Sequence, residues 1–145
     1  MALASHLMCV FCDIVAGEAD AHLVYSDEMH LAFLDRRPVF HGHTLLIPRE
    51  HHETLGDLPV AYVGPLFELA QKLSVTVAKA MDAHGSFVAI NNTVSQSVPH
   101  LHVHVVPRRF KDGLRGFFWP RRRYSGEEEM ARVAASIRTT IEGLR

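Results

Sequence analysis

The sequence predicts an α+β fold in which one long helix packs on an antiparallel sheet and a second helix follows at the C-terminus. Two patterns support this prediction. Several short stretches alternate apolar and polar residues, as half-buried strands do, and two longer segments repeat apolar residues at helical spacing. Because 145 residues suffice for one domain with a continuous core, we treat residues 1–145 as a single domain.

The first half of the chain contains three predicted strands. Residues 23–25 and 30–34 form a short antiparallel pair, and residues 26–28 supply the serine and aspartate that turns favour. Residues 43–47 form the third strand. It ends at Pro48, because proline cannot donate a hydrogen bond to a strand ladder.

A long helix follows these strands. Asp57 is predicted to cap it, and its apolar residues recur at helical spacing, namely Leu66, Ala70, Leu73, Val77 and Met81. Gly64 and Pro65 predict a kink or a restart, since proline lacks the N–H that a helix interior uses. Gly85 is predicted to end the helix in the left-handed conformation that glycine tolerates.

Two strands and a helix complete the predicted order. The strands cover residues 87–90 and 101–106, with a polar loop between them. Residues 125–128 read Ser-Gly-Glu-Glu, which predicts a capping box that opens a helix over about residues 126–144.

Composition narrows the class of protein. No apolar stretch approaches the roughly 20 residues that a membrane span needs, and the N-terminus lacks the pattern of a secretion signal, so we expect a cytoplasmic protein. The net charge of −1 excludes a globally basic nucleic-acid binder. Seven basic residues nevertheless lie between Arg108 and Arg123, either on a solvated loop or as a field that attracts a polyanion. Nucleic acid is not favoured there, because no aromatic residues alternate with the arginines.

Three histidines mark the candidate site. In the strand around His100, His102 and His104, side chains two positions apart share one face, so the three imidazoles lie together. Leu101 and Val103 point to the other face, toward the long helix. Both a three-histidine metal centre and an imidazole nucleophile fit this spacing. Metal ligands must converge to about 2.0–2.1 Å, whereas alternate residues of a flat strand stand about 6.5–7 Å apart, which suits a phosphoryl group better.

Residues 96–108 resemble the defining motif of the histidine triad (HIT) family, in which three histidines alternate with apolar residues. Residues 33–38 and 42–48 look like the nucleoside-binding strands of that family, and residues 9–18 match the opening of many bacterial members. The resemblance covers about residues 9–120. It implies a homodimer that binds a purine nucleotide or a dinucleoside polyphosphate across each sheet.

The resemblance also implies an activity and roles for individual residues. The expected enzyme hydrolyses or transfers the nucleotidyl group of adenylyl compounds, either dinucleoside polyphosphates or nucleoside phosphoramidates, without a catalytic metal. His102 would form a covalent nucleotidyl intermediate, and the backbone carbonyl of His100 would hold its tautomer. His104 would bind a phosphate oxygen, and Asp35 would accept hydrogen bonds from the ribose hydroxyls. The residues expected at the phosphate or the leaving group are Asn91, Gln96 and Ser97.

One departure from the family pattern leaves an alternative open. The loop over residues 91–96 looks about two residues shorter than usual and has no glycine before Gln96. A nucleotide-binding regulatory module with little turnover is therefore the alternative function. Residues 36–38 and 106–108 resemble the dinucleoside polyphosphate hydrolase branch, whereas residues 9–18 resemble the phosphoramidate branch, so the leaving group stays open.

The spacing of Cys9 and Cys12 suggests a metal site. A C-x-x-C pair supplies two zinc ligands, and tetrahedral closure needs two more. A pair of reduced thiols is the alternative, and a redox dithiol is least favoured because no thioredoxin-like βαβ unit surrounds the pair. The resemblance implies a structural zinc whose other ligands are His51 and His100, with His52 as an adjacent substitute.

Overall fold

The computed structural model describes residues 9–115 and 121–144 of the chain. Two compact units are present, Met1–Asp112 and Gly113–Arg145. The first unit holds the sheet and the candidate site, and the second holds the C-terminal helix. Within the described ranges, no helix combines the length and the apolar character that crossing a membrane requires.

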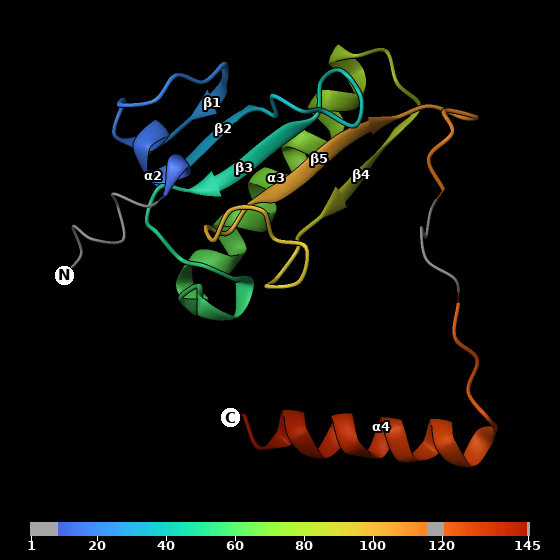
Figure 1. Ribbon diagram of the computed structural model, residues 1–145. Coiled ribbons are helices and arrows are strands. Elements are labelled where there is room, and N and C mark those ends of the chain that lie inside the picture. Colours follow the sequence, from blue (N-terminus) through green and yellow to red (C-terminus); the bar gives the residue numbers. More distant parts are fainter. Residues whose placement is uncertain (1–8, 116–120, 145) are drawn as a thin grey trace. The chain divides into compact units, whose positions relative to one another are not determined.

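The predicted antiparallel sheet is present, with five strands in the order β1-β2-β3-β5-β4 (Figure 1). Every neighbouring pair of strands is antiparallel. The last strand begins two residues later than predicted, which leaves two of the three histidines just ahead of it. The strands are β1 (Leu23–Ser26), β2 (His30–Leu34), β3 (Thr44–Pro48), β4 (Gly85–Ala89) and β5 (Val103–Arg108).

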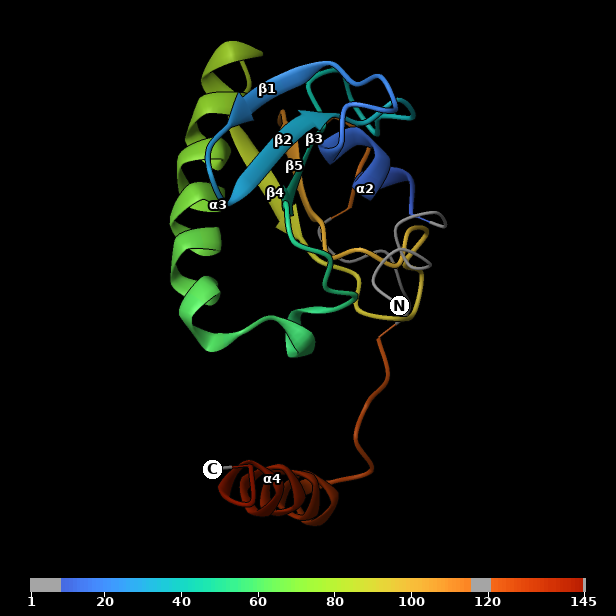
Figure 2. The same ribbon diagram turned by 90° about the vertical axis from the view of Figure 1, so that its left-hand side faces the viewer.

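The long helix α3 (Val60–Ala80) covers one face of this sheet (Figure 2). It buries the predicted apolar face against the sheet, where Leu101, Val103 and Val105 are fully buried. Each large apolar side chain removed from water in this way contributes roughly 1.5–3 kcal/mol. The buried residues of α3 are Leu66, Leu69, Ala70, Leu73 and Val77.

The start of α3 differs from the prediction. Asp57 does not cap it: the Asp57 carboxylate accepts hydrogen bonds from the backbone N–H (3.1 Å) and the hydroxyl (2.7 Å) of Thr54, across the short 3-10 helix η1 (Leu55–Asp57). The helix also continues through Pro65 without a restart. Only one backbone hydrogen bond is lost there, and the packing of the apolar face outweighs it.

The end of α3 was also predicted at the wrong residue. The helix ends at Ala80, and Asp82 takes the left-handed conformation with φ of 52°. The N–H of Ala83 then bonds to the carbonyl of Ala78 at 2.8 Å, which satisfies a carbonyl that the helix end leaves free. Gly85 instead begins β4.

The C-terminal helix α4 (Glu127–Glu142) lies close to its predicted range. The predicted capping box of Ser125 and Glu128 is wrong: Gly126 is the N-cap and has no side chain to cap the helix, and the N–H of Ser125 bonds to the Glu129 carboxylate at 2.8 Å. Residues 116–120, which belong to the basic segment, lie outside the described residues.

The short helix α2 (Val10–Val15) was not predicted, and it lies on the opposite face of the sheet from α3 (Figure 2). The Sγ atom of Cys9 accepts the N–H of Cys12 at 3.3 Å and caps this helix. Phe11 and Cys12 pack into a second core with four sheet residues, Leu31, Phe33, Leu45 and Ile47. The sheet is therefore covered on both faces, and the candidate site lies on the α2 side.

Candidate functional site

The three histidines occupy the face of the sheet that the alternation predicts. Leu101 and Val103 pack in the core under α3, so the histidines point to the opposite face. His100 and His102 are buried, and His104 is half-buried. The rings of His102 and His104 lie side by side, with their centres 4.9 Å apart.

The ring of His102 is held in one tautomer. Its Nδ1 lies 2.7 Å from the backbone carbonyl oxygen of His100. A carbonyl oxygen can only accept, so Nδ1 carries the hydrogen and Nε2 keeps its lone pair. An imidazole with a lone pair on Nε2 is a nucleophile, which is the role predicted for His102.

A cavity of about 230 Å³ lies next to these rings. His102, His104 and Ser97 line it together with Asp35 and Arg36. The rest of its wall is largely apolar and comes from α2, β2 and β3, with Val10, Phe11, Ile14, Phe33 and Leu45 as its main residues. An apolar cavity with a few polar groups in its wall fits a nucleoside monophosphate, whose base is flat and whose phosphate is charged.

Size alone would place the site elsewhere. A cavity of about 440 Å³ is lined by residues 38–41, Met81 and Arg109. Another, of about 310 Å³, lies beside α3 and the ends of β2 and β3, with Glu28, Arg49 and Tyr62 in its wall. It contains one histidine, His30, whose Nδ1 contacts the Asp27 carboxylate at 3.1 Å. The smaller cavity holds the aligned imidazoles, so chemistry and not volume identifies the site.

His43 joins this site, although sequence reasoning gave it no role. Its Nε2 lies 3.0 Å from Nδ1 of His104, and its Nδ1 accepts the N–H of Val39 at 3.1 Å. Burial is the main reason that the pKa values of His43 and His104 are lowered, that of His104 to about 4, so both rings are neutral at neutral pH. The strand register explains this contact, because Leu45, two positions after His43 and on the same face of the strand, pairs with His104.

The structure separates the predicted polar ligands into two groups. Asp35 and Ser97 line the cavity. The Asp35 carboxylate also accepts the N–H of Arg37 at 2.9 Å, which fixes its orientation. Asn91 and Gln96 are not among the described residues that line the cavity.

The side chain of Gln96 instead forms hydrogen bonds with two nearby loop residues. Its side-chain amide donates to the carbonyl of Glu53 at 2.6 Å, and its side-chain oxygen accepts the N–H of Thr93 at 2.9 Å. These two hydrogen bonds connect the loop before the histidine strand to the segment after β3. Its side chain therefore supports the loop in this conformation.

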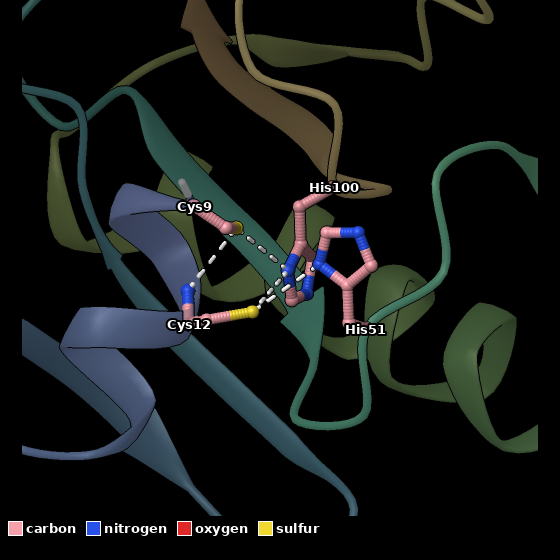
Figure 3. A group of neighbouring side chains, drawn as sticks. All are labelled: Cys9, Cys12, His51 and His100. Carbon is pink, nitrogen blue, oxygen red and sulfur yellow. Dashed lines mark hydrogen bonds between the residues drawn. The ribbon is translucent and has the colours of Figure 1, made fainter. Parts of the chain in front are cut away.

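The second predicted cluster also assembles. Figure 3 shows Cys9 and Cys12, at the start of α2, pointing toward the rings of His51 and His100. Sγ of Cys9 lies 3.4 Å from Nδ1 of His100, and Sγ of Cys12 lies 3.2 Å from Nδ1 of His51 and 3.6 Å from that of His100. Ligands about 2.3 Å (sulfur) and 2.0 Å (nitrogen) from a tetrahedral zinc stand about 3.5 Å apart. These four residues can hold a metal ion.

The ring of His100 in this cluster is in the state that a metal ligand requires. Nε2 of His100 bonds to the carbonyl of Pro48 at 2.8 Å, so it carries the hydrogen and leaves Nδ1 free for a metal. Burial lowers the pKa of His100 to about 4. Burial, followed by the hydrogen bond and charge of Cys9, raises the pKa of the Cys12 thiol to about 12 in the absence of a cation. His52, the substitute ligand, lies outside this group, with its ring beside Tyr62.

Comparison of the sequence with known protein families identifies the family. The family model of the HIT domain matches residues 16–111. This chain is a member of the HIT family. An adenylylsulfatase from Arabidopsis thaliana is 35% identical over 108 residues, which are 73% of this chain and 55% of that protein, so the chain matches about half of its length.

Two solved structures extend the comparison. A HIT family protein from Bacillus subtilis superposes with a TM-score of 0.81 at 32% identity, covering 90% of this chain and 95% of the other. A zinc-bound histidine triad family protein from Mycobacterium smegmatis superposes with a TM-score of 0.72 at 36% identity, covering 97% and 99%. The predicted family and α+β fold are thereby confirmed.

Proposed function

We propose that this protein is a hydrolase or transferase that cleaves nucleoside phosphate bonds in adenylyl compounds through a covalent intermediate on His102. One observation carries the proposal: the 2.7 Å contact between Nδ1 of His102 and the His100 carbonyl, which leaves the Nε2 lone pair beside the cavity. The relative named as an adenylylsulfatase supports the substrate class.

The reaction needs two displacements at one phosphorus atom. Nε2 of His102 forms a bond to the α-phosphorus as the bond to the leaving group breaks, and the leaving group departs with the electron pair. Water then attacks the same phosphorus, Nε2 takes back its electron pair, and the water proton passes to solvent. Neither step requires a metal, because the neighbouring N–H groups can stabilise charge on the phosphate oxygens.

The cavity suggests how the substrate lies. The base would fill the apolar slot beside α2, the ribose diol would meet Asp35, and the α-phosphate would meet His104 and Ser97. Asn91 and Gln96 remain predicted ligands of the phosphate or the leaving group. They would reach it only if the loop over residues 91–96 moved.

A substrate panel tests the proposal. Purified protein would be incubated with a diadenosine polyphosphate, an adenosine phosphoramidate and adenylyl sulfate, with and without a chelator too weak to remove buried zinc. We expect release of AMP from at least one of them at the same initial rate in both conditions. Metal-dependent cleavage, or no cleavage of any of the three, would contradict the proposal.

A nucleotide-binding regulatory module is the second candidate, and the bonding of Gln96 to Glu53 and Thr93 favours it. With Gln96 held in the loop, fewer groups face the leaving group. This candidate predicts micromolar or tighter binding of AMP with no product in a single-turnover experiment. Cleavage of the bound substrate within one turnover would remove it.

Asp35→Asn is expected to raise KM for adenylyl substrates by about tenfold and to change kcat less, because the variant loses the carboxylate charge that accepts the ribose hydroxyls. The amide oxygen can still accept the N–H of Arg37. A 2′,3′-dideoxy substrate is the control. Wild type and variant should have similar KM values for it, and a tenfold difference there would place Asp35 away from the ribose.

Gln96→Ala is expected to reduce the free energy of unfolding by about 1 kcal/mol, because it removes two hydrogen bonds that connect the loop to the segment after β3. Any loss of kcat/KM should be equal for all leaving groups. Denaturant titration and the substrate panel measure both quantities. A loss that grows as the leaving group becomes poorer would show that Gln96 contacts the leaving group during the reaction.

We also propose that the Cys9, Cys12, His51 and His100 cluster holds a structural zinc. The separations of its sulfur and nitrogen atoms and the free Nδ1 of His100 support this, as does the zinc-bound relative. A bound zinc would connect the start of α2 to the histidine strand and stabilise both. Thiolate ligands require reduced cysteines, which agrees with the predicted cytoplasmic location.

A homodimer is the remaining proposal at family level. Among the described residues, strand β4 is the outermost strand of the sheet beyond β5, and Val88 within it is exposed. Edges of this kind are commonly covered by a second chain. Light scattering should give twice the mass of one chain, and a monomer at micromolar concentration would contradict the proposal.

A further inference from the structure

Two polar residues in the wall of the catalytic cavity have no part in the proposed reaction. Asp20 and Arg36 both line the cavity, and the Arg36 guanidinium donates to the backbone carbonyl of Asp20 at 3.1 Å. We propose that these two side chains bind the amino-bearing edge of the base and make the site selective for adenine. This inference rests on the proposed function and adds the residues that select the base.

The other polar side chains of the cavity already have partners in the proposed complex. The ribose or the phosphate would occupy Asp35, Ser97, His102 and His104. The apolar part of the wall suits the flat faces of a base and offers its edge no hydrogen bond. Of the polar side chains that line the cavity in the described part of the chain, Asp20 and Arg36 are thus left for the edge of the base.

The pairing of two antiparallel segments brings these residues together. Just beyond the paired residues of β1 and β2, the N–H of Leu34 bonds to the carbonyl of His22 at 3.0 Å. In an antiparallel pair, each step back along one segment matches a step forward along the other. Two steps further on, Asp20 therefore lies opposite Arg36, where the 3.1 Å hydrogen bond forms.

This hydrogen bond places a donor beside an acceptor. A guanidinium has several N–H groups and cannot accept, and the Asp20 carbonyl occupies only Nη2 of Arg36. A carboxylate has only acceptor oxygens. Because the carbonyl and the carboxylate belong to the same residue, the free N–H groups of Arg36 and the carboxylate of Asp20 lie close together at the cavity.

Adenine has the complementary groups on one edge. Its 6-amino group donates, and the ring nitrogens N1 and N7 on either side of that group accept. The Asp20 carboxylate would accept an amino hydrogen while Arg36 donates to the neighbouring ring nitrogen. Guanine has a carbonyl oxygen at position 6, and an oxygen there cannot donate to the carboxylate.

The size of the effect follows from exposure. Asp20 and Arg36 are both exposed, so their side chains are hydrated before a nucleotide binds. A hydrogen bond to the base then replaces one to water, and its net contribution is smaller than that of a fully buried contact. We therefore expect the pair to change affinity by about tenfold and to leave the rate of the chemical step unchanged.

The experiment compares ligands that differ in one group. Purine riboside 5′-monophosphate lacks the 6-amino group of AMP and keeps the ribose and the phosphate. Isothermal titration calorimetry with the full-length protein would measure both dissociation constants. We expect AMP to bind about tenfold more tightly than purine riboside 5′-monophosphate, and GMP to bind more weakly than AMP.

Asp20→Ala should remove most of this difference, because the 6-amino group loses its acceptor. The ratio of the two dissociation constants should fall from about ten to about two. Glu18→Ala is the matched control, since Glu18 is an exposed acid on the same segment and is not among the described residues that line the cavity. This control should keep the wild-type ratio.

Arg36→Met tests the donor, because methionine keeps a long apolar side chain without an N–H. We expect AMP to bind about threefold more weakly, with no change for ribose 5-phosphate, which has no base. Arg37→Met removes the same charge one position away, outside the described lining of the cavity, and should change neither. Weaker binding of ribose 5-phosphate to Arg36→Met alone would place Arg36 at the phosphate and overturn its role at the base.

Two further results would overturn the proposal. Asp20→Ala could weaken AMP and purine riboside 5′-monophosphate equally, which would mean that Asp20 only closes the cavity. Wild type could instead prefer GMP and lose that preference in Asp20→Ala, which would place the carboxylate at the N1–H and 2-amino groups of guanine. Because AMP binds without being cleaved, these results do not depend on the intermediate at His102. Selective binding of AMP without cleavage of any adenylyl substrate would contradict the proposed function alone.

Discussion

His102→Ala is expected to lower kcat for adenylyl substrates by at least about 10³-fold, because no other group can form the nucleotidyl intermediate. The ring of His102 is buried, and its Nδ1 donates to the His100 carbonyl. Its removal therefore deletes the nucleophile and leaves Asp35 and the apolar slot in place. AMP should still bind, with a dissociation constant within about tenfold of the wild-type value.

Rapid-quench kinetics and mass spectrometry measure this result. In wild type, a brief reaction quenched at alkaline pH should add one AMP to the peptide that contains His102, because phosphorus–nitrogen bonds to imidazole survive base better than acid. His22→Ala is the matched control, since His22 is exposed and has no role in the site. Equal activity in His102→Ala, or an adduct on another residue, would contradict the mechanism.

The histidine face could be predicted from sequence because its signal is local. Alternation along the histidine strand places His102 and His104 on one face and Leu101 and Val103 under the helix, and the structure agrees. The resemblance to the HIT family predicted His51 as a metal ligand. Spacing alone could not have done so, because His51 and Cys12 are 39 residues apart and meet only in the folded chain.

Other parts of the site depend on tertiary contacts that cannot be predicted from local sequence patterns. Helix α2 has six residues, too few for a helical period, yet it forms one wall of the cavity. The contact between His43 and His104 requires the register of β3 against β5. The bonding of Gln96 to Glu53 requires the conformation of two loops. Each of these features is set by tertiary packing, which a single sequence encodes only indirectly.

The Cys9→Ser/Cys12→Ser double variant is expected to lose its zinc, falling from about one ion per chain to near zero, and to melt at a temperature on the order of 10 °C lower. A change of 1 kcal/mol shifts the melting temperature of a domain of this size by roughly 4 °C, and a structural zinc contributes several times that energy. Elemental analysis and calorimetry measure the two quantities. His52→Asn, adjacent to the ligand His51 but outside the cluster, is the control that should keep its zinc.

The pH dependence separates zinc from a pair of buried thiols, because the two have opposite signs. Zinc needs deprotonated ligands, so the zinc-loaded protein should lose stability as pH falls and protons compete for the cysteines and histidines. In chelated protein, burial raises the pKa of the Cys12 thiol from 9.0 to about 12, so the neutral thiol is favoured. Its contribution to stability is complete below pH 9 and is lost as pH rises toward 12. Full zinc occupancy in the double variant would place the metal on the three histidines, whereas identical pH profiles with and without chelator would show that zinc does not stabilise the protein.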